Sequence, residues 1–344
     1  MEVEVEVEEP FDLDLTLSPS FVSSMYVRLR ERSWAKVAGR LAGLRVEQVG
    51  GGLLRASHSG HAARDIEEVV VHEAGCWHRP FEEGLARLPP SLREPLELLA
   101  STYPGVRLPA APWDLPYVII AVALSRRTRY DSLVLKWCRR IWAAFGGDLV
   151  LLSRAPAPLL KERVGSSYQV IQLKEVVDGL LSIPARLTEL SAGLSLELSL
   201  SSPLDLTRLS PPIARVLLLR ACKFLGPKTV DSIILSCLKD PSAAPCDTHL
   251  STVATRVGLV PRGLSQPSKP LCSRRSCRVQ PLPSLPRCPL EDKCLRAEVA
   301  KLGSLAGWLQ TLCYIHGSSV CRSRRPRCAS CPLEAICAAS PSAP

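Results

Sequence analysis

Four cysteines near the C-terminal end restrict the local fold more than any other feature of the chain. They are spaced C-x6-C-x2-C-x5-C, within 17 residues. Four thiolates so close together can surround one compact centre, and ligation by thiolates alone favours zinc or an iron–sulfur cluster. Zinc sites usually pair two short cysteine knuckles, whereas this loop has one. The spacing favours an iron–sulfur cluster held by Cys321, Cys328, Cys331 and Cys337, with zinc or disulfide bonds as the alternatives.

The residues around this loop resemble the cluster loop of the endonuclease III family of DNA glycosylases. The similarity lies in His316-Gly317, in Pro326-Arg327 before the second cysteine, and in Pro332-Leu333 after the third. The resemblance implies that these cysteines hold a [4Fe-4S] cluster and that the loop touches the DNA backbone. The loop also has four arginines, whose guanidinium groups suit phosphates: Arg322, Arg324, Arg325 and Arg327. A solvated run of charge is the alternative interpretation.

Two helical segments upstream of the loop each begin at a polar residue. Apolar residues at helical spacing start just after Lys228, and Pro227 suits a first helical position. Asp247 is a natural N-cap for the next apolar repeat. The repeats are Val230, Ile233, Ile234 and Cys237, then Leu250, Val253, Ala254 and Val257.

These segments resemble the helix-hairpin-helix and Gly/Pro-Asp motif of the same superfamily (HhH-GPD). The resemblance implies that Lys228 attacks the sugar of a flipped nucleotide and forms a Schiff base, while Asp247 stabilises the charged sugar. It also implies DNA contacts at Leu225, Gly226 and Thr229. A surface lysine and a purely structural cap are the alternative.

The hairpin departs from the family pattern at its tip. The family usually reads Leu-Pro-Gly-hydrophobic-Gly, but residues 222–226 read Cys-Lys-Phe-Leu-Gly, without the first glycine and the proline. In the family, backbone amides of this hairpin hold a phosphate. We therefore expect a weakened or reshaped phosphate contact, which the charge of Lys223 could offset.

Weaker similarities extend toward the N-terminus. Residues 113–131 resemble the family helix that ends in a Ser-x-Gln-type turn, where a polar side chain fills the gap left by the flipped base, and Arg127 takes that place here. Residues 11–17 and 103–108 resemble 8-oxoguanine and 3-methyladenine glycosylases, which have an N-terminal β-domain.

The expected fold class is α+β, with a mainly helical glycosylase core behind a small antiparallel β-domain. We expect a β-rich domain at 1–82, a helical domain at 83–312 and a cluster loop with its tail at 313–344. Within the helical domain, the hairpin and catalytic segment span 213–258, and an irregular cysteine-containing insertion spans 260–295. Period-2 patterns predict strands at 3–7 and 13–17, and short apolar stretches predict strands at 44–49, 53–54 and 69–71. The pattern predicts helices at 27–41 and 296–316.

Charge and hydropathy indicate the partner and the compartment. The net charge is +10 although the first 14 residues carry seven acids and no base. A basic body suits a polyanion such as DNA. The N-terminus lacks a basic leader and no apolar run could span a bilayer. We expect a cytoplasmic, nucleoid-associated monomer with no membrane contact.

A second cysteine quartet precedes the cluster loop, and neither family pattern contains it. Its members are Cys272, Cys277, Cys288 and Cys294. A second metal site, two disulfides and unpaired thiols all stay open, with a structural role favoured.

The combined features predict a DNA glycosylase with AP-lyase activity in base-excision repair. Its partner would be double-stranded DNA with a damaged or mismatched base, whose identity the sequence does not indicate. The alternatives are a monofunctional glycosylase and a non-catalytic protein that binds DNA and senses damage.

Overall fold

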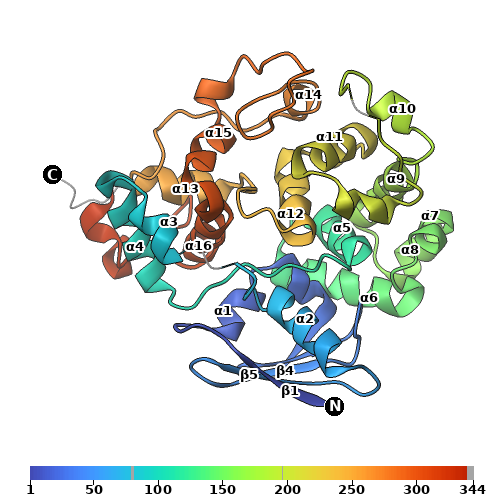
Figure 1. The fold of residues 1–344 in the computed structure, drawn as a ribbon, viewed down its shortest axis with the longest axis horizontal. Helices are drawn as coiled ribbons and strands as arrows, with labels where there is room; N and C mark the ends of the chain where they lie inside the picture. Colours follow the sequence, from blue (N-terminus) through green and yellow to red (C-terminus); the bar gives the residue numbers. More distant parts are fainter. Residues whose placement is uncertain (79–80, 196, 339–344) are drawn as a thin grey trace.

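The computed structural model describes residues 1–78, 81–195 and 197–338. A five-stranded antiparallel sheet lies at one end of the molecule, with strand order β1-β5-β4-β3-β2 (Figure 1). Its strands are β1 (Glu2–Glu6), β2 (Tyr26–Arg30), β3 (Ser33–Lys36), β4 (Arg45–Gly50) and β5 (Leu53–Ser57). The strands predicted at 3–7, 44–49 and 53–54 are confirmed by β1, β4 and β5.

Three N-terminal predictions are wrong. Residues Leu13–Leu17 form helix α1, because the Asp12 carboxylate caps it by accepting a hydrogen bond from the Leu15 amide at 2.8 Å. The predicted helix at 27–41 is the hairpin of β2 and β3, which turns at Arg32 with φ 55°. The predicted strand at 69–71 lies within helix α2 (Ala63–Glu73).

Most of the remaining chain is helical, as expected. Pro-rich breaks separate many of the helices, and Pro is found in the first turn of several of them. The helices are α3 (Phe81–Ala86), α4 (Pro90–Thr102), α5 (Leu115–Leu124), α6 (Leu135–Phe145), α7 (Leu149–Arg154), α8 (Ala157–Arg163), α9 (Tyr168–Leu181), α10 (Leu187–Leu190), α11 (Pro211–Ala221), α12 (Pro227–Leu238), α13 (Thr248–Arg256), α14 (Lys269–Cys272), α15 (Leu295–Val299) and α16 (Ala306–Ser319).

The single helix predicted at 296–316 is divided. Gly303 adopts φ 57° and ψ −126°, which breaks the helical path between α15 and α16. A side chain there would be strained, whereas glycine tolerates this region. The segment expected as an irregular insertion, 260–295, contains helix α14 and a short 3-10 turn at Glu291–Lys293 before α15 begins at Leu295.

One hydrophobic core joins the sheet to the helices. The inward side chains of the sheet, such as Val5 and Leu54, belong to the same buried cluster as Ile119 of α5 and Leu309 of α16. Apolar burial of this extent is the main stabilising contribution to the fold. The sheet and the helical body are therefore packed as one unit.

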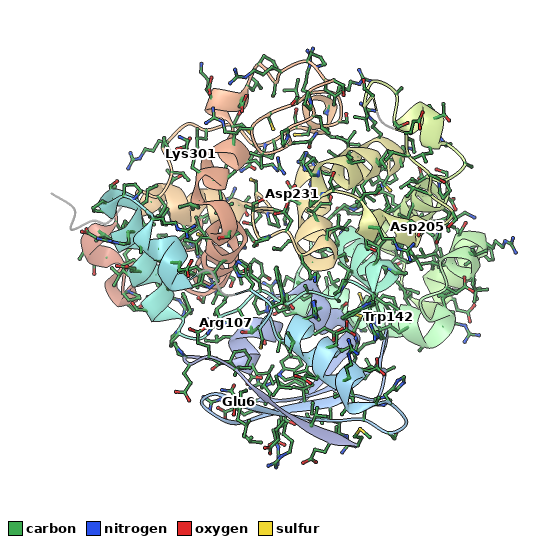
Figure 2. The ribbon with its side chains drawn as sticks, viewed as in Figure 1. Glu6, Arg107, Trp142, Asp205, Asp231 and Lys301 are labelled. Atoms are coloured by element: carbon green, nitrogen blue, oxygen red, sulfur yellow. The ribbon has the colours of Figure 1, made fainter. Side chains whose placement is uncertain are left out.

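The connection between α4 and α5 is fixed against the N-terminal segment. Arg107, labelled in Figure 2, donates hydrogen bonds to the carbonyls of Glu8 at 2.8 Å and Pro10 at 3.0 Å. Gly105 has φ +83°, and a Cβ there would meet the Asp12 nitrogen at 2.5 Å. This close approach requires glycine.

A buried ionic cluster also crosses between sheet and helices. The Lys36 ammonium on β3 donates to Glu73 of α2 and, at 2.9 Å, to Asp114 before α5. The Tyr26 hydroxyl donates to the same Glu73 carboxylate. None of the helices in the described ranges is long and apolar enough to cross a membrane.

Candidate active site and cysteine loop

Lys228 lies exposed in the first turn of α12, directly after the hairpin between α11 and α12. The turn is ordered by Thr229, whose hydroxyl lies 2.9 Å from the Gly226 nitrogen and 2.8 Å from the Gly226 carbonyl. The opposite face of α12 is fully buried through Val230 and Ile233. The helix predicted after Lys228 is confirmed, and it holds the lysine at the surface.

Asp247 caps α13, as predicted. One carboxylate oxygen accepts a hydrogen bond from the Leu250 amide at 2.7 Å, and the other accepts one from the Gln310 side chain at 3.4 Å. The residue is 7 % exposed. Its position is therefore fixed from two directions, by its own helix and by α16.

Two residues of α16 lie beside Asp247 that the sequence did not indicate. Gln310 donates to its carboxylate, and Tyr314, one turn later, packs edge-on against His249 with ring centroids 5.3 Å apart. Burial raises the pKa of Tyr314, and the charge of Asp247 raises it further. A Gln and a Tyr four residues apart on one helix face were the available signal.

The hairpin and the turn at 125–128 meet at Phe224. The Arg126 guanidinium lies 5.2 Å from the Phe224 ring centroid, and the Lys223 ammonium lies 5.0 Å from it. Arg127, next in the chain, is exposed with φ 53°. Arg126 therefore joins the turn that contains Arg127 to the hairpin at Phe224.

Tyr168 and Gln169, at the start of α9, support the same turn. The Gln169 amide donates to the Arg126 carbonyl at 2.9 Å, and the Tyr168 hydroxyl donates to it at 3.3 Å. Tyr168 is 47 % exposed. These residues lie over 40 positions away from Arg126, so no local pattern predicts the contacts.

The four C-terminal cysteines surround one hollow of about 50 Å³. This exceeds the space that a single water needs. Burial raises the pKa of the Cys331 thiol, and the charges of Cys321, Cys328 and Cys337 raise it further. Across the part of the chain that is described, no three His, Cys, Asp or Glu side chains converge as ligands of a single metal ion.

The donor set nonetheless fits a cubane cluster. A [4Fe-4S] cluster binds each of four cysteines at a different iron, so its ligands surround a volume rather than a point. The hollow lined by these thiols has that arrangement. Arg256 of α13 adds a hydrogen bond from Nη1 to the Cys321 sulfur at 3.2 Å.

The arginines of the loop are all exposed, namely Arg322, Arg324, Arg325 and Arg327. The second quartet lies in the insertion, and its four members are free, partly buried thiols. Neither disulfides nor a grouping of metal ligands is found there among the residues with described positions.

Comparison with known proteins gives similarity at the level of structure. No family model and no curated protein matches the sequence. The 8-oxoguanine glycosylase/lyase of Clostridium acetobutylicum, in complex with double-stranded DNA containing cytosine opposite 8-oxoG, matches with a TM-score of 0.65 at 15 % identity. The match covers 92 % of this chain and 97 % of that one.

A second similar structure is 3-methyladenine DNA-glycosylase from Archaeoglobus fulgidus. Its TM-score is 0.61 at 12 % identity, covering 92 % of this chain and 98 % of that one. Both matches extend across the sheet and the helices. The chain therefore shares the α+β fold of these two DNA glycosylases, and the predicted fold class is confirmed.

Proposed function

We propose that this protein is a DNA glycosylase with AP-lyase activity that acts in base-excision repair. The observation that carries the proposal is the exposed Lys228 at the start of α12, followed by Asp247 fixed as the cap of α13. The similar Clostridium protein is described as a glycosylase/lyase and is bound to double-stranded DNA. Its fold supports the same chemistry here.

Lys228 would act as a nucleophile in its neutral amine form. The Nζ lone pair forms a bond to C1′ of a flipped nucleotide, and the glycosidic bond breaks, so that the base leaves with the electron pair and gains a proton. Asp247 offsets the positive charge of the sugar. The sugar ring opens to a Schiff base, C2′ loses a proton, and the C3′–oxygen bond breaks, which nicks the strand. Water then releases the lysine.

The residues beside Asp247 support recognition of a flipped base. Flipped bases are read by stacking and by hydrogen bonds to their edges. Tyr314 supplies an aromatic ring and Gln310 an amide, both on the α16 face that meets Asp247. The proposed partner is double-stranded DNA with a damaged or mismatched base, bound by a monomer in the nucleoid.

The cysteine loop is proposed to hold a [4Fe-4S] cluster through Cys321, Cys328, Cys331 and Cys337. The cluster would fix the loop, and the exposed arginines would contact the DNA backbone. Arg127 would contact DNA with its exposed side chain. Leu225, Gly226 and Thr229 would do so through the hairpin backbone, because Leu225 is 0 % and Thr229 7 % exposed. Neither the cluster nor these contacts take part in the bond changes.

Borohydride trapping tests the catalytic proposal. Wild-type protein is incubated with duplexes containing an abasic site, 8-oxoguanine, oxidised pyrimidines, or uracil or thymine in mismatches. We expect a covalent adduct that is lost in Lys228→Ala and kept in Lys223→Ala, the matched control on the same hairpin. Base release without an adduct would indicate a monofunctional glycosylase. Binding without either activity would indicate a non-catalytic damage sensor.

Iron and sulfide analysis tests the cluster. We expect about four of each per chain, with loss in Cys328→Ser. Cys313→Ser removes a buried cysteine outside the loop and serves as the control. Zinc, or no metal after anaerobic purification and reconstitution, would overturn the cluster.

A further inference from the structure

The insertion at 260–295 contacts the tip of the hairpin. Lys269, at the start of α14, donates from its ammonium group to the carbonyls of Cys222 at 2.5 Å and Lys223 at 2.8 Å. These carbonyls follow directly on α11. The last carbonyls of a helix lack partners within the helix and favour a cation. Lys269 supplies both the hydrogen bonds and the charge.

The insertion contacts the body of α11 as well. Arg220 donates from Nε to the Ser273 carbonyl at 2.8 Å. Deeper in the molecule, Gln280 accepts a hydrogen bond from Arg215. Both Arg215 and Gln280 are 1 % exposed. Polar groups at that depth are costly to leave unpaired, so these contacts hold the insertion firmly on α11.

The end of the insertion is also joined to α12. Asp231, labelled near the centre of Figure 2, lies one turn beyond Lys228. It is fully buried and accepts from Arg215 at 2.6 Å and from Arg296 of α15 at 3.0 Å. Both helices of the hairpin are thus connected to the segment 269–296.

Lys223, whose charge is expected to offset the altered tip, forms an ion pair at the surface. Its ammonium donates to Glu175 of α9 at 2.8 Å, so its charge is already paired at the surface. The cation that reaches the hairpin backbone comes instead from position 269, far along the chain. The tip lacks the glycine and proline of the family pattern, and the insertion supplies contacts at that point.

We propose that residues 269–296 form a brace that fixes the hairpin for DNA backbone binding, with Lys269 as its positioning residue. Only the DNA-binding part of this proposal rests on the proposed function; the contact of Lys269 with the hairpin does not. Lys269 acts through the Cys222 and Lys223 carbonyls and does not touch DNA. Without Lys269, the hairpin tip is less ordered in the free protein. The free-energy cost of ordering the tip on binding then lowers the affinity for DNA.

Hydrogen–deuterium exchange tests the brace on the full chain without DNA. We expect Lys269→Met to speed exchange in peptides covering 222–229 while peptides of α5 stay unchanged. Lys269→Arg restores part of the protection because it keeps a donor and the charge. Arg274→Met is the matched control, since it removes an exposed charge of the same insertion. Unchanged exchange at 222–229 in Lys269→Met would overturn the brace.

Binding to a duplex with an uncleavable abasic-site analogue, across a salt series, tests the DNA role. We expect Lys269→Met to raise Kd about tenfold, with the slope of log K against log salt unchanged. The half-saturating enzyme concentration in single turnover should rise with little change in maximal rate. A slope reduced by about 0.9 would mean that Lys269 contacts a phosphate directly, which contradicts a positioning role.

The two proposals fail in different ways. If wild-type protein neither binds nor cleaves any duplex, the proposed function is wrong. The hydrogen-exchange experiment, which uses no DNA, still tests the brace. If wild-type protein is active and Lys269→Met matches it in exchange and in Kd, the brace is wrong and the glycosylase proposal stands.

Discussion

At the scale of single residues, Asp247 combines two tasks that substitution can separate. Its carboxylate caps α13 through the Leu250 amide and would stabilise the charged sugar. Asparagine keeps an acceptor for the cap but loses the charge. We expect Asp247→Asn to abolish base release with stability nearly unchanged, and Asp247→Ala to lower the free energy of unfolding by about 1 kcal/mol as well. Single-turnover assays and urea unfolding measure the two effects. Full activity in Asp247→Asn would contradict the catalytic role.

Glu73 makes stability depend on pH. Burial raises its pKa to about 7, against the opposing effect of Lys36, and the charge of Asp114 raises it too. The fold therefore favours the protonated carboxyl, whose stabilisation is complete below the ordinary pKa of 4.5 and is lost as pH rises toward 7.

We expect the free energy of unfolding to decline between pH 5 and pH 8 by on the order of 1–3 kcal/mol from this group. Glu73→Gln should remove that decline, because the amide does not titrate. Urea unfolding at several pH values measures it, with Glu67→Gln, an exposed residue of the same helix, as the control. Equal pH dependence in wild type and Glu73→Gln would exclude this origin.

The sequence predicts the positions of residues that are set by a local pattern. Lys228 and Asp247 were identified as the starts of α12 and α13 because capping and apolar spacing act within one turn. Gln310, Tyr314 and Lys269 were not identified as site residues. Their partners lie 46 or more positions away, and only the packing of α13, α14 and α16 brings them together.

At the scale of elements, the cysteine loop depends on the end of α13. Arg256 in its last turn donates to the Cys321 sulfur and, at 3.0 Å, to the Arg322 carbonyl. At the other end of the loop, the Ala338 amide donates a hydrogen bond to the Arg256 carbonyl at 2.9 Å. The loop is thus held at both ends by one residue.

We expect Arg256→Gln to accelerate iron loss to a chelator about tenfold, because the Cys321 end of the loop is released. The decay of cluster absorbance measures it. Arg64→Gln, which removes an exposed arginine of α2, is the control. Equal decay in Arg256→Gln and wild type would show that the loop holds its cluster without α13.

The predicted elements were wrong where a helix cap or a turn overrode the apolar periodicity. Leu13, Leu15 and Leu17 alternate as in a strand, but a five-residue segment also fits just over one helical turn, and the Asp12 cap decides for the helix. The positive φ at Arg32 similarly divides residues 27–41 into two strands. Short segments carry too few residues to distinguish period 2 from period 3.6.

At the scale of the whole molecule, the sheet and the helices share one core. Lys36 and Asp114 form a buried ion pair across their contact, and removal of one partner leaves an unpaired charge. We therefore propose that the composition changes at residue 82 but that the sheet and the helices form one cooperative unit.

We expect the full chain to unfold in one transition, with tryptophan fluorescence and circular dichroism giving the same midpoint. A fragment of residues 83–338 should be poorly folded, because it exposes the apolar surface that the sheet covers and leaves Asp114 without Lys36. Gel filtration and circular dichroism of the fragment check this. A compact, cooperatively unfolding fragment would show that the two parts fold independently.

The contact between Lys269 and the hairpin tip has a consequence for how this sequence can vary. If Lys269 braces the tip as proposed, positions 223 and 224 do not need the proline and glycine of the family pattern, whereas Gly226 is kept. Saturation mutagenesis selected for DNA binding should therefore accept many residues at 223 and 224 but few at 269. On this proposal, recognition depends less on the residue types of the hairpin tip than on the lysine that supports it.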